Sequence, residues 1–348
     1  MASEYQGRLR VIYPLERGRI VLRTEQDWQK NLEPVAVAPD GCCHEFEVRH
    51  VRHHLAYKPC IVDGDRLTWS EGTNKLWILD LNGVQDVYPH FHSGLAGRLS
   101  EILELPSALL GRSHRMRVYL PAGYDENFQK AFPVLYVHDG QNLFFPDEAF
   151  FGTEWRLDET LDLLDAMNLI DRVIVVGLYS DERETDYTQP GYELYARSLV
   201  EEVRPFIGGR YRVLGDRRHT GILGASLGGV VSLYAGWQWP EVFGNVGCMS
   251  STFGYRDDLL DRVHDDPVEP RRHLKLYLDS GWPNDNYDVT FSMATALVER
   301  GFAYGRDLVH FAFPRLRHEE SAWGGRVHLP LQLFSGKIRR FAALYQKH

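Results

Sequence analysis

The residues best suited to catalysis surround Ser226, which lies in the segment Gly224-Ala225-Ser226-Leu227-Gly228. The apolar segment 220–223 precedes this G-x-S-x-G pattern, and a helix-like segment over 227–237 follows it. A serine oxygen attacks well when a tight strand-to-helix turn projects it above the edge of a sheet, and flanking glycines let neighbouring backbone approach. The helix N-terminus then offers N–H groups to a developing oxyanion. The pattern predicts that Ser226 is a nucleophile; a glycine-rich packing turn is the alternative.

A nucleophilic serine needs a base, and six histidines follow Ser226 in the sequence. They are His264, His273, His310, His318, His328 and His348. His310 lies within the apolar segment 308–313, whereas His318 lies on the loop just after it. In this type of site the histidine follows the serine and the acid, and a loop after the last strand places it above the sheet edge. We therefore predict that His318 is the base.

The base needs a carboxylate that orients it, and three aspartates in the segment 279–288 are candidates. Asp285 lies at the tip of the predicted loop and is favoured. Asp279 lies at the end of a strand, where we expect it to hold the loop through backbone N–H bonds. Asp288 is expected to cap the helix that begins near residue 289.

A second oxyanion donor should come from the turn after an early strand. The apolar segment 134–137 is followed by His138-Asp139-Gly140, in which glycine lets the backbone turn. We predict that the backbone N–H groups of Gln141 and Leu227 bind the oxyanion. The side chains at these two positions are not needed for that role.

Chemistries that depend on a cofactor lack support in the sequence. It contains neither a G-x-x-x-x-G-K-[ST] phosphate loop nor a G-x-G-x-x-G pattern, and it has no H-E-x-x-H or C-x-x-C spacing. The neighbours His50, His53 and His54 could suggest a metal site, but fifteen histidines make such neighbours common. We therefore expect no metal and no other cofactor.

Strands and helices alternate from about residue 115 onward. Apolar strand candidates cover 117–120, 134–137, 173–176, 220–223, 246–249, 274–278 and 308–313. Helix candidates cover 154–167, 192–207, 227–237, 289–300 and 328–345. Nearly continuous apolar strands indicate burial on both faces, so the pattern predicts an α/β fold with a mostly parallel sheet and helices on both faces. Loops after the carboxyl ends of its strands would meet at one edge.

The first hundred residues have a different pattern. Short apolar or alternating segments at 19–22, 34–37, 44–48, 55–58 and 75–79 are separated by turn residues. This spacing predicts a small antiparallel β-sandwich. With a boundary within 92–112, we expect an all-β domain over 1–105 and an α/β domain over 106–348.

Composition limits the partners. The 348 residues are 44% hydrophobic and 25% charged, with a net charge of −9, so we expect neither nucleic acid nor an anionic membrane surface as a partner. No apolar run approaches the roughly 18 residues of a membrane span. With four cysteines and no apolar leader segment, we expect reduced thiols and a cytoplasmic protein. The expected partner is a small molecule, and a homodimer is left open.

Four segments resemble the putative-esterase branch of the α/β-hydrolases, which includes enterochelin, feruloyl and acetylxylan esterases, S-formylglutathione hydrolase and the mycolyltransferases. They are 135–144 (LYVHDGQNLF), 224–229 (GASLGG), 278–281 (LDSG) with Asp285, and 318–323 (HEESAW). The resemblance covers about residues 106–348. It implies an α/β-hydrolase fold, metal-free acyl transfer from an ester, and the triad Ser226, Asp285 and His318.

The resemblance also suggests substrate contacts and an N-terminal module. Related proteins carry an arginine and an aromatic residue in the loop that here spans 178–190, so Arg183 and Tyr187 are predicted to bind substrate; a solvated, salt-bridged loop is the alternative. The first hundred residues resemble immunoglobulin-like or carbohydrate-binding modules. Trp28, Trp69 and Trp77 could form a glycan platform, but an aromatic core is favoured.

Together, these features predict a serine esterase that acts through an acyl-enzyme on a sugar-linked, siderophore-linked or other small ester. Two alternatives share the same residues. An acyltransferase would pass the acyl group to a sugar or alcohol, and a catalytically idle homologue would only bind carbohydrate.

Overall fold

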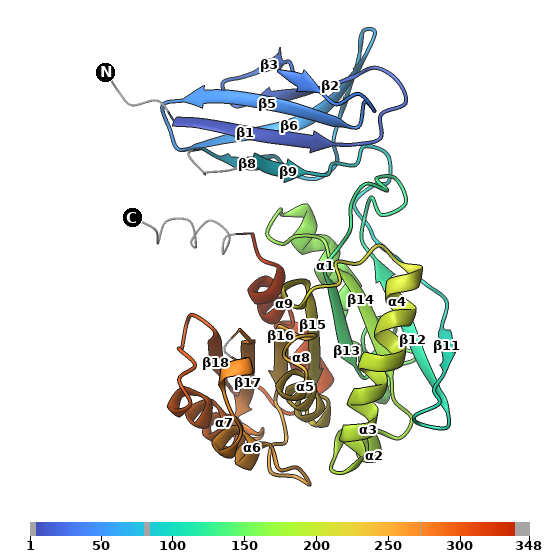
Figure 1. Cartoon of the computed structure of the whole chain (residues 1–348), viewed down its shortest axis with the longest axis vertical. Helices are drawn as coiled ribbons and strands as arrows, with labels where there is room; N and C mark the ends of the chain where they lie inside the picture. The colour runs from blue at the N-terminus through green and yellow to red at the C-terminus, as the bar shows by residue number, and fades with distance from the viewer. Residues whose placement is uncertain (1–4, 80–83, 272, 338–348) are drawn as a thin grey trace.

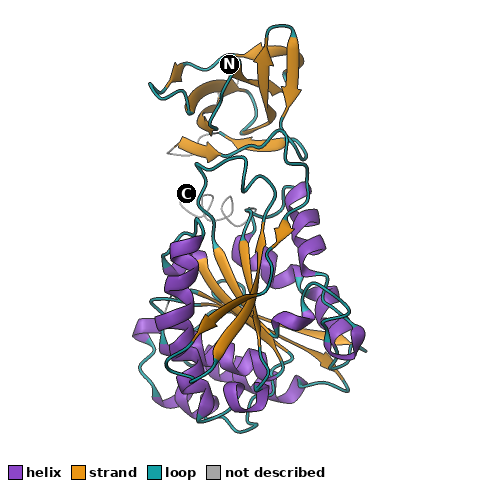
Figure 2. Ribbon diagram, turned by 90° about the vertical axis from the view of Figure 1, so that its right-hand side faces the viewer, coloured by secondary structure: helices purple, strands orange, loops and turns teal. Residues whose placement is uncertain are grey.

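The computed structural model describes residues 5–79, 84–271 and 273–337. An all-β domain at the N-terminal end of the chain lies end to end with a larger α/β domain (Figure 1). Figure 2 shows the twisted sheet of the larger domain between helices on both sides.

The N-terminal domain is built from two sheets that enclose a small core. One sheet has the order β4 (Ala36–Val37), β5 (Cys43–His50), β1 (Tyr5–Ile12), β9 (Val84–Val87). The other has the order β3 (Asp27–Leu32), β2 (Arg19–Thr24), β6 (His54–Asp63), β7 (Arg66–Trp69), with β8 (Lys75–Ile78) also paired to β6. The predicted sandwich is antiparallel, but β1 and β9 run parallel, because the chain crosses to the other sheet between these two strands.

The tryptophans of this domain have different environments. Trp77 is fully buried in the core with Leu9 and Phe46. Trp69 is exposed, and its ring centroid lies 6.4 Å from that of Trp28 at an interplanar angle of 50°. Trp77 therefore belongs to the core, as favoured from the sequence, whereas Trp28 and Trp69 form a pair of tilted indoles on one sheet.

The α/β domain contains one long mixed sheet. In spatial order its strands are β10 (Arg98–Leu99), β12 (Ser113–Leu120), β14 (Ile174–Tyr179), β13 (Val134–His138), β15 (Thr220–Ala225), β16 (Asn245–Met249), β17 (Lys275–Trp282) and β18 (Leu308–Pro314), with β11 (Leu103–Pro106) also on β12. The strands from β13 to β18 are parallel to one another, and β12 is antiparallel to β14. Because β10 and β11 pair with β12, the sheet begins earlier in the chain than residue 106.

Helices cover both faces of the sheet. They are α1 (Leu157–Ala166), α2 (Arg183–Tyr187), α3 (Gly191–Ser198), α4 (Arg204–Arg210), α5 (Leu227–Gln238), α6 (Leu259–Asp265), α7 (Tyr287–Glu299), α8 (Glu320–Arg326) and α9 (His328–Ser335). Apolar residues of α3 to α7 pack on one face, and those of α1, α8 and α9 pack on the other. This is the α/β-hydrolase arrangement. The helix predicted over 328–345 begins at His328 as α9 but ends at Ser335, where Gly336 is extended. Residues from 338 onward lie outside the described part of the chain.

The two domains are joined by polar contacts, from exposed to buried, at the edge where the parallel strands begin. The Glu126 carboxylate accepts the amides of Phe91 and His92 and the hydroxyl of Tyr13. The Arg172 guanidinium, which is only 7% exposed, donates to the Ala122 carbonyl at 2.7 Å and to the Tyr88 carbonyl. Because these bonds satisfy charged groups that burial would otherwise penalise, they fasten the N-terminal domain to this edge.

Candidate active site

Ser226 lies in the turn between β15 and α5 with strained backbone angles. Its φ is 57° and its ψ is −124°, a conformation that costs a non-glycine residue about 1–3 kcal/mol. A Cβ atom at Gly224 would lie 2.4 Å from the backbone of Gly228, so the close approach of strand and helix requires glycine at position 224. The Ser226 amide donates to the Met249 carbonyl at 2.9 Å, which ties the turn to β16.

The structure brings the three predicted triad residues together. The Nε2 atom of His318 lies 2.9 Å from the Oγ of Ser226, and its Nδ1 lies 2.8 Å from the Oδ1 of Asp285. The imidazole packs edge-on against Trp323, with ring centroids 4.9 Å apart at 87°. This chain of contacts lets His318 take a proton from Ser226 while a carboxylate fixes the orientation of the ring.

Asp285 is held in a fully buried, hydrogen-bonded position. Its carboxylate accepts the amide of Gly281 at 2.6 Å and that of Asn286 at 2.7 Å, and it also accepts the hydroxyl of Ser250. Burial raises the pKa of this carboxyl, but the bonds from His318, Ser250 and the two amides outweigh it and hold the pKa at about 2. The carboxylate therefore stays ionised throughout the neutral range.

The two alternative acids lie elsewhere. Asp279 is fully buried and pairs with Arg326, whose Nε and Nη2 lie 2.9 and 3.0 Å from its oxygens. It also accepts the Ser250 amide at 3.2 Å, as predicted for a loop-holding residue. The prediction that Asp288 caps a helix is wrong, because α7 begins at Tyr287 and Asp288 lies within its first turn.

Arg326 is bonded to this group of residues, although the sequence did not indicate it. Its side chain, 3% exposed, bonds Asp279 and also donates to the Ser250 hydroxyl at 2.7 Å. Since that hydroxyl in turn donates to Asp285, a buried network runs from Arg326 through Ser250 to the orienting acid. The partners come together only in the fold, because 47 residues separate Arg326 from Asp279.

The turn after β13 presents the second predicted oxyanion donor. Residues 140–142 form a single 3₁₀ turn, and Gly140 approaches the backbone of Gly177 so closely that a Cβ atom would lie 2.5 Å from it. Within the described part of the chain, the amides of Gln141 and Leu227 donate to no other group. Both N–H groups are therefore available to an oxyanion.

Arg183 and Tyr187, the predicted substrate contacts, differ in how much of each side chain is exposed. The Arg183 Nε lies 3.0 Å from both oxygens of Asp139, and its Nη2 donates to the Ala225 carbonyl at 3.3 Å. The side chain remains partly exposed beside Ser226. Tyr187 is fully buried with its ring 5.7 Å from the Arg183 guanidinium. Arg183 therefore lines the pocket, whereas Tyr187 lies behind it and is not among the lining residues, and its contact with substrate stays a prediction.

A pocket of about 460 Å³ opens in front of Ser226. It combines polar and aromatic side chains from the turn over 140–142, here called the oxyanion turn, from α2, and from residues 318–323, here called the His318 loop. They are Asn142, Phe150, Phe151, Thr153, Arg183, Ser226, His318, Glu319, Glu320, Ser321 and Trp323. Phe151 is 98% exposed and has a φ of 60°. Its apolar ring therefore lies in solvent at the mouth of the pocket, and its backbone has a conformation that is unfavourable for a residue other than glycine.

Glu320 lines the pocket and, like Arg326, was not indicated by the sequence. Its carboxylate accepts the side-chain amide of Asn142 at 2.9 Å and the indole N–H of Trp155. Burial raises the pKa of Glu320 to about 7. The negative charge of Asp139 also raises this pKa, whereas the hydrogen bond from Trp155 lowers it. These bonds connect the His318 loop to the oxyanion turn, between residues 178 positions apart in the chain.

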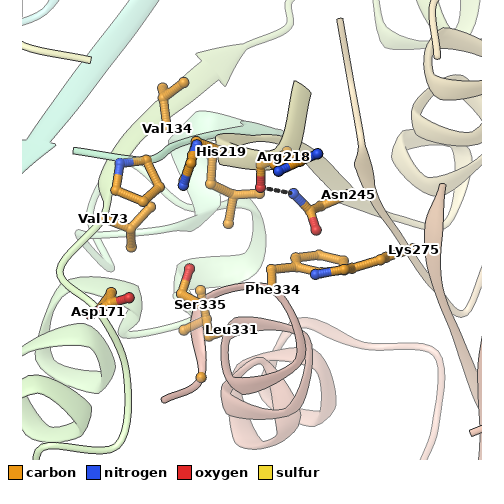
Figure 3. Close-up of a pocket in the computed structure, with 14 residues that line it drawn as sticks. Val134, Asp171, Val173, Arg218, His219, Asn245, Lys275, Leu331, Phe334 and Ser335 are labelled. Carbon is orange, nitrogen blue, oxygen red and sulfur yellow. Dashed lines mark hydrogen bonds between the residues drawn. The ribbon is translucent and has the colours of Figure 1, made fainter. Parts of the chain in front are cut away.

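A second cavity, of about 420 Å³, opens at the opposite edge, where the parallel strands begin (Figure 3). It includes His219, Lys275 and Asn245, whose amide donates to the Arg218 carbonyl. Among the residues described, no group of three or more His, Cys, Asp or Glu side chains is placed to hold a metal ion. No helix within the same residues is both long and apolar enough to cross a membrane.

The fold and the turn at Ser226 define an α/β-hydrolase. Residues 107–301, more than half of the chain, match the family described as "Putative esterase". The chain belongs to this family, as the resemblance of its segments indicated.

Individual relatives are more distant. An uncharacterized protein of Bacillus subtilis, YbbA, is 28% identical over 165 residues, which are 45% of this chain and 64% of YbbA. A ferulic acid esterase structure matches with a TM-score of 0.59 at 20% identity, over 69% of this chain and 98% of its own. The enterobactin esterase FES from Shigella flexneri matches with a TM-score of 0.57 at 14% identity, over 99% of this chain and 93% of its own. The match to FES extends over the N-terminal domain, and at these identities the two structures establish likeness of fold.

Proposed function

We propose that the protein is a serine carboxylic-ester hydrolase with Ser226, His318 and Asp285 as its catalytic triad. The observation that carries the proposal is the unbroken chain of contacts from the buried Asp285 through His318 to a serine in a strained turn. Membership of the putative esterase family supports the reaction class.

In the proposed mechanism, His318 takes the hydroxyl proton as Ser226 Oγ bonds to the ester carbonyl carbon. The carbonyl oxygen becomes an oxyanion that accepts the N–H groups of Gln141 and Leu227. Collapse of this intermediate breaks the bond to the alcohol oxygen, which receives the proton from His318, and leaves an acyl-enzyme. Water then repeats the sequence and releases the acid.

The pocket favours esters that carry an aromatic ring with polar substituents. Phe150 and Phe151 offer exposed rings at its mouth, while Asn142, Arg183 and Glu320 offer hydrogen-bonding groups deeper in. This combination of apolar surface and a few polar groups is typical of small-molecule sites. Proteins of similar fold include a ferulic acid esterase and an enterobactin esterase, so aryl esters linked to sugars or siderophores are the first substrates to test.

The test combines active-site labelling with product analysis. We expect a fluorophosphonate to label the wild-type protein and the Ser321→Ala control, which alters another serine of the pocket, but not Ser226→Ala. A panel of aryl and alkyl esters should then yield the free acid. Absence of an adduct on folded wild-type protein would favour an idle homologue, and transfer to an added alcohol in preference to water would identify an acyltransferase.

A further inference from the structure

The short helix α2 contacts both turns that carry the predicted oxyanion donors. Its first residue, Arg183, has its Nε 3.0 Å from both carboxylate oxygens of Asp139, and its Nη2 donates to the Ala225 carbonyl at 3.3 Å. Asp139 immediately precedes the oxyanion turn, and Ala225 is the last residue of β15, just before Ser226. One side chain therefore bonds the two backbone segments that face a reacting ester carbonyl.

The two residues that Arg183 bonds have the same position relative to the donors. Asp139 lies two residues before Gln141, and Ala225 lies two residues before Leu227. Two residues of chain span at most about 7 Å even when extended, so a shift of either bonded group moves the N–H group that follows it. The guanidinium is therefore placed to fix the separation of the two N–H groups.

The Asp139 carboxylate also lies between the oxyanion turn and the start of α5. A Cβ atom added at Gly228 would lie 3.2 Å from the Cβ of His138 and 3.4 Å from Oδ2 of Asp139. Asp139 has a φ of 58° and a ψ of 50°, and its side chain is only 6% exposed. A left-handed backbone and a buried charge both need bonds that hold them in place, and Arg183 supplies the bonds to the charge.

A second residue of α2 supports the same turn. The Tyr187 hydroxyl accepts the Asp139 amide at 3.4 Å, and the centre of the Tyr187 ring lies 5.7 Å from the Arg183 guanidinium carbon. The ring is fully buried and lies edge-on to Tyr195, with ring centroids 5.4 Å apart. α2 therefore holds Asp139 by its amide as well as by its carboxylate, and a fixed aromatic ring lies behind the guanidinium.

An arginine can hold these turns without competing for their donors. A guanidinium has five N–H donors and no acceptor, so it bonds the turns through a carboxylate and a carbonyl oxygen. Within the part of the chain that the structure describes, the amides of Gln141 and Leu227 donate to no other group. The planar arrangement of its N–H groups also lets one side chain bond both turns, which a lysine ammonium matches poorly.

We propose that Arg183 is a positioning residue that holds the N–H groups of Gln141 and Leu227 at the separation an oxyanion requires. The proposal rests on the proposed esterase function, and it gives Arg183 a role that needs no contact with substrate. Removal of one oxyanion donor costs roughly 10²–10³-fold in kcat, because such donors act only within a narrow range of distances. Displacing the two turns should therefore lower kcat on every ester and leave ground-state binding little changed.

Kinetics on two kinds of ester separates positioning from substrate binding. Phenyl acetate has no polar group besides its ester, whereas methyl 3,4-dihydroxybenzoate has hydroxyls that a guanidinium could bond. We expect Arg183→Met to lower kcat by about 10²-fold on both esters, with KM changed by less than about threefold. Arg183→Lys should recover only part of kcat. Glu184→Gln, which changes a side chain of α2 that is 63% exposed, should keep wild-type kinetics.

A double substitution separates this effect from damage to the fold. Because Arg183→Met leaves the buried Asp139 carboxylate unpaired, the protein that combines it with Asp139→Asn removes that charge as well. We expect the combined variant to lose no more kcat than Arg183→Met does, because both residues belong to one contact. Circular dichroism checks that each variant is folded.

A transition-state analogue measures the oxyanion site directly. A trifluoromethyl ketone forms a tetrahedral adduct with a nucleophilic serine, and the oxygen of the adduct takes the place of the oxyanion. We expect its affinity to fall in Arg183→Met and in the combined variant by the same factor as kcat/KM, whereas Glu184→Gln should bind it as the wild type does.

Two results overturn the proposal. A loss confined to the dihydroxybenzoate ester, or one seen in KM alone, would make Arg183 a substrate-binding residue. An unchanged kcat in folded Arg183→Met would show that the two turns hold their positions without it. Inactivity of the wild type on both esters would instead overturn the proposed function, on which this proposal rests.

Discussion

Two cavities of similar size open at opposite edges of the sheet, and each contains a histidine bonded to an aspartate. At the carboxyl edge, His318 Nδ1 lies 2.8 Å from Asp285; at the amino edge, His219 Nδ1 lies 2.7 Å from Asp216. The two imidazoles are equally accessible, with side chains 33% and 35% exposed. The aspartates differ, because Asp285 is fully buried whereas Asp216 is 56% exposed.

The difference shows what a histidine–aspartate pair lacks on its own. Only the carboxyl edge adds a serine in a strained turn, two unpaired amides and a buried network behind the acid. These features depend on a parallel sheet, whose strand-to-helix turns all meet at that edge. The pair at the amino edge is an exposed histidine–aspartate hydrogen bond at a single 3₁₀ turn over 217–219, and exposed polar pairs contribute little to stability.

The largest expected difference between the two sites is the change in kcat when the histidine of each is removed. We expect His318→Ala to lower kcat on a good ester by about 10⁴-fold or more, since it removes the group that bonds the Ser226 hydroxyl and would take its proton. His219→Ala, the matched change at the amino edge, should leave kcat within about twofold because it is remote from the reacting atoms. Steady-state kinetics on both variants decides the matter, and comparable losses in the two would refute the assignment of the site.

The next largest contrast concerns stability. Arg326→Met should lower the free energy of unfolding by about 3–5 kcal/mol, because it leaves the buried Asp279 charge without its partner. Asp216→Asn should change it by less than about 1 kcal/mol, as expected for an exposed pair. Urea unfolding measures both. Arg326→Met should also reduce kcat more than it changes KM, since the network orients Asp285; an unaltered kcat would confine Arg326 to a structural role.

The smallest expected effect is a pH dependence at Glu320. Its pKa of about 7 lies above the ordinary value because burial favours the neutral carboxyl. The pocket therefore gains a negative charge as pH rises through 7. The stability that the raised pKa contributes is fully present below the ordinary pKa of 4.5 and is lost as pH rises from there to about 7. We expect KM for a neutral ester to change a few-fold between pH 6 and 8 in the wild type and to stay flat in Glu320→Gln. Parallel profiles in the two proteins would exclude this residue as the cause.

Local patterns were enough to predict the parts of the site that local geometry determines. The turn at Ser226 follows from adjacent glycines, and the position of His318 follows from the end of an apolar strand. The paired roles of Arg326 with Asp279 and of Glu320 with Trp155 could not be predicted, because each depends on distant segments that meet only in the fold. The burial of Tyr187 could not be predicted for a similar reason, because an aromatic residue in a loop sequence does not reveal that α2 places it behind Arg183.

The secondary structure, too, was predictable where it depends on local sequence and not where it depends on distant pairing. Strands with continuous apolar sequence, such as β13 and β15, were predictable because burial on both faces dictates their composition. The short β10 and β11 were not predictable, because they are held by backbone pairing with β12 and their side chains are not buried enough to require an apolar sequence. The parallel contact between β1 and β9 depends on how the chain crosses between sheets, and residues within the strands do not record it.

The attachment through Glu126 and Arg172 has a consequence for how the molecule can be altered. It places the N-terminal domain on the amino edge, and every residue that lines the catalytic pocket falls between positions 142 and 323. The domain therefore lies at the edge opposite the pocket and contributes no residue to its lining. We expect surface substitutions in this domain to leave the mouth of the pocket unchanged.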